Sequence, residues 1–98
     1  MNEIVWSEHA WISYNAITLS LLERWSIKIA MRLENQVDEL IERLRNSKYI
    51  CPPAPTLPNA RRCVINKQTS LIYTVEGDTV HIVSMYDNRS DITFWKYT

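Results

Sequence analysis

The feature that most constrains the fold is a pair of β-rich runs in the second half of the chain, joined at its only glycine. Residues 70–75 and 79–86 are rich in β-branched and aromatic residues, which fit a pleated sheet. Gly77, within the turn at residues 76–78, can adopt the positive φ that a hairpin loop of three or four residues needs. The two runs therefore predict a β-hairpin. Because the second run is apolar on both faces, we expect it inside the sheet rather than at an edge.

The start of the chain predicts a short strand that leads directly into a helix. Residues 3–6 are β-rich, and Ser7 is a suitable N-cap for a helix that runs from Glu8 to about Arg24. Apolar residues recur in this helix at spacings of three and four, which indicates one buried stripe. The aromatic core residues expected on this stripe are Trp11, Tyr14 and Trp25.

A second, longer helix is predicted after Ser26, which can cap it. Its apolar residues fall almost on a heptad seam, and its other face is charged. A link of two or three residues between the helices predicts an antiparallel helical hairpin. The residues on the seam are Ala30, Leu33, Val37, Leu40, Ile41 and Leu44.

A proline-rich stretch separates the helices from the predicted sheet. Residues 46–60 contain all four prolines of the chain, so neither a helix nor a central strand can continue through them. Residues 61–67 then read as a further strand. The order of elements predicts a single α+β domain over residues 1–98, in which an N-terminal strand and an antiparallel helical hairpin pack on a small antiparallel β-sheet.

Charge and hydropathy exclude some classes of protein. The 11 basic and 11 acidic residues cancel, so no global field attracts nucleic acid, and any such binding must come from a local patch. No apolar run approaches the roughly 20 residues that span a bilayer, and no charged-then-apolar leader opens the sequence. We therefore expect a cytoplasmic protein without a membrane partner.

Motifs for metals, cofactors and familiar enzymes are missing from the sequence. Cys51 and Cys63 are too few and too widely spaced for a zinc site, and His9 and His81 do not complete one. We expect the two cysteines to be reduced. A single glycine rules out glycine loops that bind phosphate, and no nucleophile elbow, HExxH or Walker motif occurs. The sequence predicts no metal and no cofactor.

The polar residues that could form a site lie at strand ends and in the tail. In an antiparallel sheet these ends can meet at one edge, where cations and phenols could bind phosphate and stabilise charge on it. In the alternative interpretation Arg89 only pairs with Asp87 or Asp91, and Arg61 or Arg62 lies along the surface. The candidates are Arg61 and Arg62, then Tyr86, Asp87, Asn88 and Arg89, and finally Lys96 and Tyr97.

The order of elements and several local sequences resemble the RelE/ParE toxin superfamily. The resemblance rests on the opening residues 4–8, the helical hairpin, the strand led by Arg61 and Arg62, the run at 71–75 and the close at 83–89. It covers nearly the whole chain. It implies the toxin of a type II toxin–antitoxin module, such as those that stabilise plasmids, which inhibits growth until a cognate antitoxin binds it in a hetero-oligomer.

The resemblance implies two alternative mechanisms. RelE-like members are ribosome-dependent endonucleases that cut mRNA in the A site. Arg61 or Arg62, together with Arg89, would then contact the scissile phosphate. Trp95 or Tyr97 would lie near the position of the tyrosine that RelE-like members carry in their tail. ParE-like members bind and poison DNA gyrase without catalysis. The nucleases carry lysines around the segment between the helices and the next strand and have a basic net charge, and this chain has neither. The ParE-like alternative is therefore favoured.

The resemblance also implies two surfaces for partners. The exposed rim of the helical hairpin would face the target, and the sheet edge with the aromatic tail would bind the antitoxin. The candidate binding residues at that edge and in the tail are Tyr86, Asp87, Asn88, Trp95 and Lys96.

Overall fold

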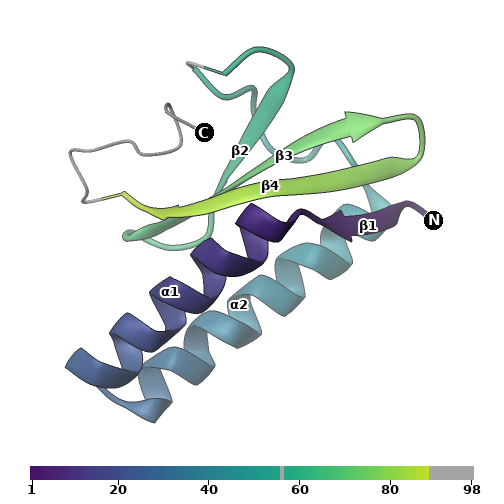
Figure 1. The fold of residues 1–98 in the computed structure, drawn as a ribbon. Helices are drawn as coiled ribbons and strands as arrows, with labels where there is room; N and C mark the ends of the chain where they lie inside the picture. The colour runs from purple at the N-terminus through teal and green to yellow at the C-terminus, as the bar shows by residue number, and fades with distance from the viewer. Residues whose placement is uncertain (56, 89–98) are drawn as a thin grey trace.

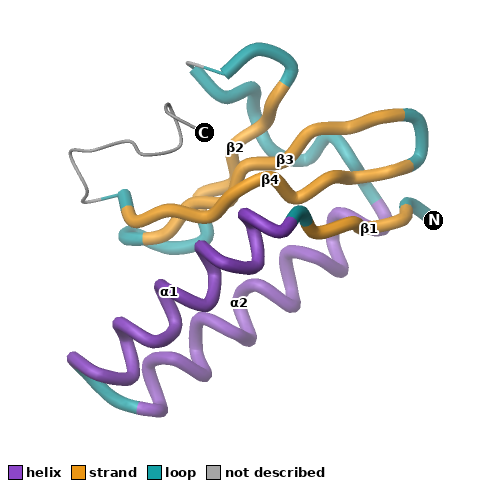
Figure 2. Tube along the Cα trace, in the orientation of Figure 1, coloured by secondary structure: helices purple, strands orange, loops and turns teal. Residues whose placement is uncertain are grey.

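The computed structural model describes residues 1–55 and 57–88, which form two helices and four strands (Figures 1 and 2). The predicted order of elements is confirmed. No helix among these residues is long and apolar enough to cross a membrane. The elements are β1 (Glu3–Trp6), α1 (Glu8–Arg24), α2 (Ile27–Asn46), β2 (Ala60–Val64), β3 (Thr69–Glu76) and β4 (Thr79–Asp87).

The sheet is mixed, with the strand order β1-β4-β3-β2. Strand β4 lies inside it, as its two apolar faces predict, and pairs antiparallel with β3. Strand β1 pairs with β4 in parallel, with Glu3 opposite Thr79, whereas we expected a purely antiparallel sheet. Parallel pairing needs a long connection between the strands, and the two helices and the β2–β3 segment supply one here.

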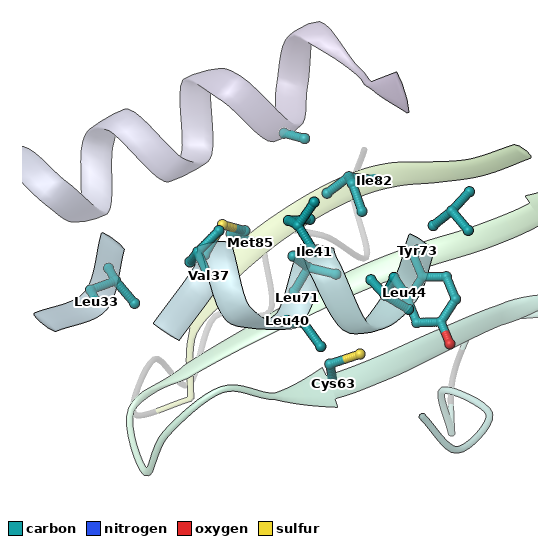
Figure 3. Packing of buried hydrophobic residues seen from close by; sticks show 12 residues of the cluster. Leu33, Val37, Leu40, Ile41, Leu44, Cys63, Leu71, Tyr73, Ile82 and Met85 are labelled. Atoms are coloured by element: carbon teal, nitrogen blue, oxygen red, sulfur yellow. The ribbon is translucent and has the colours of Figure 1, made fainter. Parts of the chain in front are cut away.

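The helical hairpin covers one face of the sheet (Figure 1). All six seam residues of α2 are buried, as predicted. Five of them, all except Ala30, share one core cluster with residues of β3 and β4 (Figure 3). Leu71 and Tyr73 point into this core, while Ile72 between them belongs to a smaller cluster on the opposite face. We call these the inner face, toward the helices, and the outer face.

Helix α1 departs from the predicted packing. Ser7 caps it as expected, accepting a hydrogen bond from the Ala10 N–H at 3.0 Å. However, Trp11 and Trp25 are 47% and 66% exposed, so the expectation that they are core residues is wrong. The fully buried residue near the start of α1 is Ala10, whose small side chain lets the helix approach the sheet closely. Trp11 instead stacks on Trp6, with ring centroids 4.5 Å apart.

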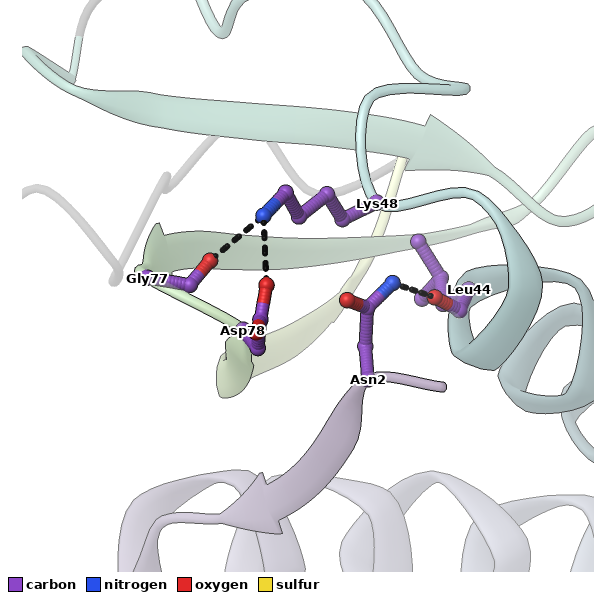
Figure 4. A network of polar contacts seen from close by, with 5 residues as sticks. All are labelled: Asn2, Leu44, Lys48, Gly77 and Asp78. Carbon is purple, nitrogen blue, oxygen red and sulfur yellow. Dashed lines mark hydrogen bonds and ion pairs between the residues drawn. The ribbon is translucent and has the colours of Figure 1, made fainter.

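The turn between β3 and β4 is tighter than expected. Only Gly77 and Asp78 lie between the strands, where we expected a loop of three or four residues. Gly77 has a φ of 59°, whereas the φ of Asp78 is not positive. This combination fits a two-residue hairpin turn with glycine in the first position. Lys48, just after α2, contacts both turn residues, at 2.7 Å from the Gly77 carbonyl and 3.1 Å from Asp78 Oδ1 (Figure 4).

The two cysteines form a disulfide, so the expectation of a reduced pair is wrong. Pro53 forms an isolated bridge with Arg61, and Arg62 donates its N–H to the Pro52 carbonyl at 3.0 Å. This pairing places the proline-rich segment beside β2. It brings the Cα atoms of Cys51 and Cys63 to 5.3 Å, inside the range that a disulfide spans. Sequence spacing did not reveal this approach, because prolines suggested an unpaired connector.

Candidate functional site

The side chains of Arg61 and Arg62 diverge. Adjacent residues of a strand point to opposite faces of the sheet. Arg61 Nη1 donates to the Cys51 carbonyl at 2.7 Å, and its guanidinium carbon lies 4.9 Å from the centre of the Tyr49 ring. Arg62 is directed to the outer face, where its guanidinium carbon lies 5.8 Å from the Tyr86 ring centre. The two arginines therefore do not form one cationic site.

Arg62 belongs to a hydrogen-bonded cluster with Ser70 and Asn88. Its Nε donates to Ser70 Oγ and its Nη2 to Asn88 Oδ1, both at 3.3 Å. Ser70, which is fully buried, donates its hydroxyl to the same Asn88 oxygen at 2.6 Å. Because each oxygen in this cluster accepts at least one hydrogen bond, the cluster holds the Arg62 side chain against the outer face. We call these three residues the Arg62 cluster.

Asn88 is fixed by the turn between β2 and β3. Its N–H donates to the Gln68 carbonyl at 2.6 Å, and its Nδ2 to the Lys67 carbonyl at 3.3 Å. Asn66 shapes that turn, because its Oδ1 accepts from the N–H groups of Gln68 and Thr69 at 2.8 and 3.0 Å. The end of β4 is thus attached to a turn far from it in sequence.

The predicted meeting of strand ends is correct in part. Arg62 does meet Tyr86 and Asn88, but on the outer face rather than where the strands end, because Arg62 lies in the middle of β2, level with Ile72 and Ser84. Asp87 lies opposite Thr69 in the register. The remaining predicted site residues lie outside the described part of the chain: Arg89, Trp95, Lys96 and Tyr97.

Ser70 and Asn66 were missed by the sequence analysis. Asn66 carried a usable signal, since an asparagine between two β-rich runs is typical of a turn in which the side chain binds the backbone. Ser70 carried none, because a serine in a strand does not reveal that it will be buried beside an arginine. Ser13 was missed for the same reason: its hydroxyl accepts the Met85 N–H at 3.0 Å and ties α1 to β4.

A groove of about 380 Å³ lies between α1 and the end of β4. Its wall on the helix is mixed, with apolar residues beside Ser20 and Arg24, and its wall on the sheet ends at Tyr86 and Asp87. Tyr86 thus lines this groove, while its ring lies near Arg62 on the outer face. The other lining residues are His9, Ile12, Ser13, Ala16, Ile17, Leu21, Trp25, Gln68, Thr69 and Met85.

Helix α1 is apolar on a second, exposed face. Ile12 and Leu19 are 58% and 57% exposed, and Leu22 is exposed as well. These three residues are spaced by seven and three, so they share one side of the helix, away from the buried Ala10 and Ser13. More exposed apolar residues follow at the helix turn and at the start of α2. We call the set Ile12, Leu19, Leu22, Trp25, Ile27 and Met31 the hairpin surface.

Neither tyrosine with a shifted pKa has the properties of a base. Burial, together with the smaller effects of the Glu34 and Asp38 carboxylates, raises the pKa of Tyr14 to about 12. Burial also raises the pKa of Tyr73, against smaller lowering effects of the hydrogen bond with Cys51 and the charge of Arg61. Both phenols stay protonated at neutral pH. Among the described residues, no group of three or more His, Cys, Asp or Glu could hold a metal ion.

Comparisons with known proteins link this fold to toxins. No protein-family model matches the sequence, and no curated protein matches it significantly. Solved structures are similar over most of the chain. One is the chromosomal ParDE toxin–antitoxin system of P. aeruginosa, with a TM-score of 0.74 and 17% identity over 89% of this chain and 96% of that one.

Two further structures show the same likeness. The YoeB/ParE toxin of Agrobacterium tumefaciens has a TM-score of 0.65 and 12% identity, with 88% of this chain and 98% of that chain covered. The DinJ–YafQ complex of E. coli has a TM-score of 0.65 and 13% identity, with 94% and 99% covered. The chain therefore has the RelE/ParE toxin fold, as the sequence analysis expected.

Proposed function

We propose that the protein is the toxin of a type II toxin–antitoxin pair and that it acts in the ParE-like way, by binding DNA gyrase without catalysing a reaction. The fold supports the first part, since similar solved structures include a ParDE system and a DinJ–YafQ toxin–antitoxin complex. Those complexes also support a cognate antitoxin as the partner of this chain. We place that antitoxin at the β4 end, around Tyr86, Asp87 and Asn88, and on the tail that contains Trp95 and Lys96.

One observation carries the non-catalytic mechanism. Arg61 and Arg62, the two described cations proposed for a nuclease, are on opposite faces and engaged in structural contacts with Cys51 and with Ser70 and Asn88. A nuclease site needs several charged groups aimed at one phosphate. The zero net charge points the same way, because a protein that binds ribosomal RNA gains from excess positive charge.

The hairpin surface is our candidate for the contact with gyrase. A protein–protein contact needs apolar side chains that are exposed in the free protein, and this surface provides them on a rigid helical hairpin. The α2 side of the hairpin also carries exposed charges at its rim, such as Glu39 and Arg43. An apolar centre with a polar rim is the usual anatomy of such interfaces.

A comparison of two surface variants tests this assignment. Leu19→Asp should abolish toxicity on induction, because it places a charge in the apolar centre of the hairpin surface. Asn59→Asp adds the same charge at an exposed site just before β2, outside the hairpin surface, and should leave toxicity unchanged. Thermal melts of both variants check the fold. Full toxicity of a folded Leu19→Asp variant would refute the hairpin surface as the target contact.

The RelE-like nuclease is the second candidate, because one observation favours it. Arg62 and the Tyr86 phenol lie on the same outer face, beside Asn88, and could contact a phosphate there. Arg62→Gln distinguishes the two mechanisms, since glutamine keeps hydrogen-bonding groups but removes the charge. Under the nuclease mechanism this variant loses toxicity, and wild type produces new 5′ ends in the A-site codon of mRNA on stalled ribosomes. Under our proposal the variant stays toxic and no new ends form.

A further inference from the structure

The outer face of the sheet is covered by the segment between α2 and β2. We call the described residues of this segment, 47–55 and 57–59, the connector. Ala54 and Leu57 of the connector pack against Ile72 and Tyr86, whose side chains are 0% and 7% exposed. This small outer core is separate from the inner core beneath the helices. Without the connector, Ile72 and Tyr86 would face solvent beside the Arg62 cluster.

Before Cys51 the connector is attached to β3 and to its turn, through hydrogen bonds from Tyr73 Oη to the Lys48 carbonyl at 2.8 Å and from Lys48 Nζ to the Gly77 carbonyl at 2.7 Å. After Cys51 it has few noncovalent attachments, among them the hydrogen bond from the Ala60 N–H to the Leu57 carbonyl at 3.3 Å. Pro52, Pro53, Pro55 and Pro58 have no backbone N–H, so half of the residues from 51 to 58 cannot donate a backbone hydrogen bond to the sheet. Three more hydrogen bonds attach it to β2. They are Ala54 N–H to the Ala60 carbonyl at 2.8 Å, Arg62 N–H to the Pro52 carbonyl at 3.0 Å, and Arg61 Nη1 to the Cys51 carbonyl at 2.7 Å.

The Cys51–Cys63 disulfide is the covalent attachment of the connector to the sheet. Its two ends differ in accessibility, because Cys63 is 3% exposed in the inner core whereas Cys51 is only half-buried. A disulfide in the reducing cytoplasm, where the sequence analysis places this protein, is typically transient and responsive to redox state. A partly exposed cysteine at the start of a segment with few hydrogen bonds to the sheet is the arrangement that such a response needs.

We propose that this disulfide is a redox latch whose reduction by a dithiol releases the connector and uncovers the outer core. One thiolate of the reductant attacks Cys51 Sγ, the sulfur–sulfur bond breaks, and Cys63 leaves as a thiolate that takes up a proton. The second thiol of the reductant then attacks the mixed disulfide and releases Cys51 as a thiol. The reductant becomes a disulfide, having supplied two electrons and two protons. The inference does not depend on the proposed function.

Hydrogen exchange of the oxidised and reduced full chain tests the latch. We expect dithiothreitol to accelerate amide exchange at Ala54 and Arg62 by about tenfold or more, because their hydrogen bonds open when the connector leaves. Amides in the middle of α2 should be unaffected, since the inner core stays packed. The protein has no other cysteines, so the reductant has no second target in it.

A double variant provides the matched control. Cys51→Ser with Cys63→Ser should exchange like the reduced protein and should not respond to dithiothreitol. Exchange at Ala54 and Arg62 that is the same with and without the reductant would overturn the proposal. So would equal acceleration throughout α2, which would make the disulfide a staple for the whole fold. A disulfide that stays intact in the most reducing glutathione buffer would overturn it as well, because the latch could not open in a cell.

Discussion

At the scale of single residues, the Arg62 cluster shows how a candidate catalytic group becomes a structural one. The guanidinium of Arg62 donates to Ser70 and Asn88, and the Asn88 oxygen accepts from both of the other residues. Each bond depends on the others, because removal of one partner leaves a polar group without a partner on a largely buried face. The end of β4 is therefore attached to β2 through side chains as well as through β3.

Asn88 is the residue whose removal should disturb this cluster most. Asn88→Ala should lower the free energy of unfolding by about 2 kcal/mol, because it leaves the buried Ser70 hydroxyl and the Arg62 guanidinium without their shared acceptor. Asn88→Asp keeps the acceptor oxygen beside Arg62 and should recover most of that loss. Urea unfolding of both variants measures the difference. Equal destabilisation by Ala and Asp would contradict the role of the Asn88 oxygen.

Tyr14 should make stability depend on alkaline pH. Its pKa is about 12 in the folded protein and 10.0 in a free tyrosine, so the unfolded chain loses the proton first. The stabilising effect is complete below pH 10 and disappears as the pH rises toward 12. Tyr14→Phe should therefore flatten the loss of stability across this window. Tyr73 remains in the variant and contributes in the same direction, so a residual slope is expected.

Urea melts of wild type and Tyr14→Phe at neutral pH and through the alkaline window check this expectation. The ultraviolet absorbance of phenolate, followed in the folded protein, gives a second measurement of the same titration. Identical slopes for the two proteins would contradict the assignment of the raised pKa to Tyr14.

At the scale of elements, much of the fold could be predicted because local signals agree with the tertiary structure. The helix caps at Ser7 and Ser26 and the seam of α2 are correct. Local signals fail where distant partners decide the outcome. Trp11 fits the helical period, yet its neighbour, the small Ala10, packs against the sheet instead, and Trp25 at the end of α1 is exposed.

The turn at Gly77 gives a test of strand pairing. A Cβ added there would meet no atom within 4 Å, so any penalty comes from the backbone, which has a φ of +59°. Gly77→Ala should lower the free energy of unfolding by about 1–2 kcal/mol, because a side chain disfavours that conformation. Glu76→Ala, at the neighbouring exposed position, should change it by less than about 0.5 kcal/mol. Thermal unfolding compares the pair, and a Gly77→Ala variant as stable as wild type would contradict the strained turn.

The seam of α2 gives a test of the inner core. Leu44 is fully buried, so Leu44→Ala should lower the free energy of unfolding by about 2–5 kcal/mol through lost burial and a cavity. Met31→Ala, on the same helix at a site 58% exposed, should change it by less than about 0.5 kcal/mol. Chemical denaturation measures both. Similar losses for the two variants would contradict the packing of α2 described above.

At the scale of the whole molecule, pairing between segments explains what the sequence analysis could not predict. The disulfide follows from the approach of the connector to β2, and the prolines that suggested an unpaired connector concealed it. The candidate site, too, was only partly predictable from the sequence. Residue types identified Arg61, Arg62 and Asn88, but only the alternation of β2 side chains and the register of the sheet separate Arg61 from Arg62.

The two main surfaces of the molecule bear on the proposed function. The helical hairpin presents an exposed apolar surface, and the sheet presents the Arg62 cluster and the connector on the face opposite to the helices. A binding toxin needs only the first of these surfaces to reach its target. A nuclease would need the second one to be open and strongly cationic.

The most direct test is a reaction of purified DNA gyrase with plasmid DNA and ATP, with and without the oxidised full-length protein. Our account predicts that cleaved plasmid linked to gyrase accumulates with wild type and with Arg62→Gln, but not with Leu19→Asp. Addition of the cognate antitoxin should abolish the effect. Unchanged supercoiling and no cleaved plasmid, with a protein that still binds the proposed antitoxin, would contradict the central claim that this protein acts by binding gyrase.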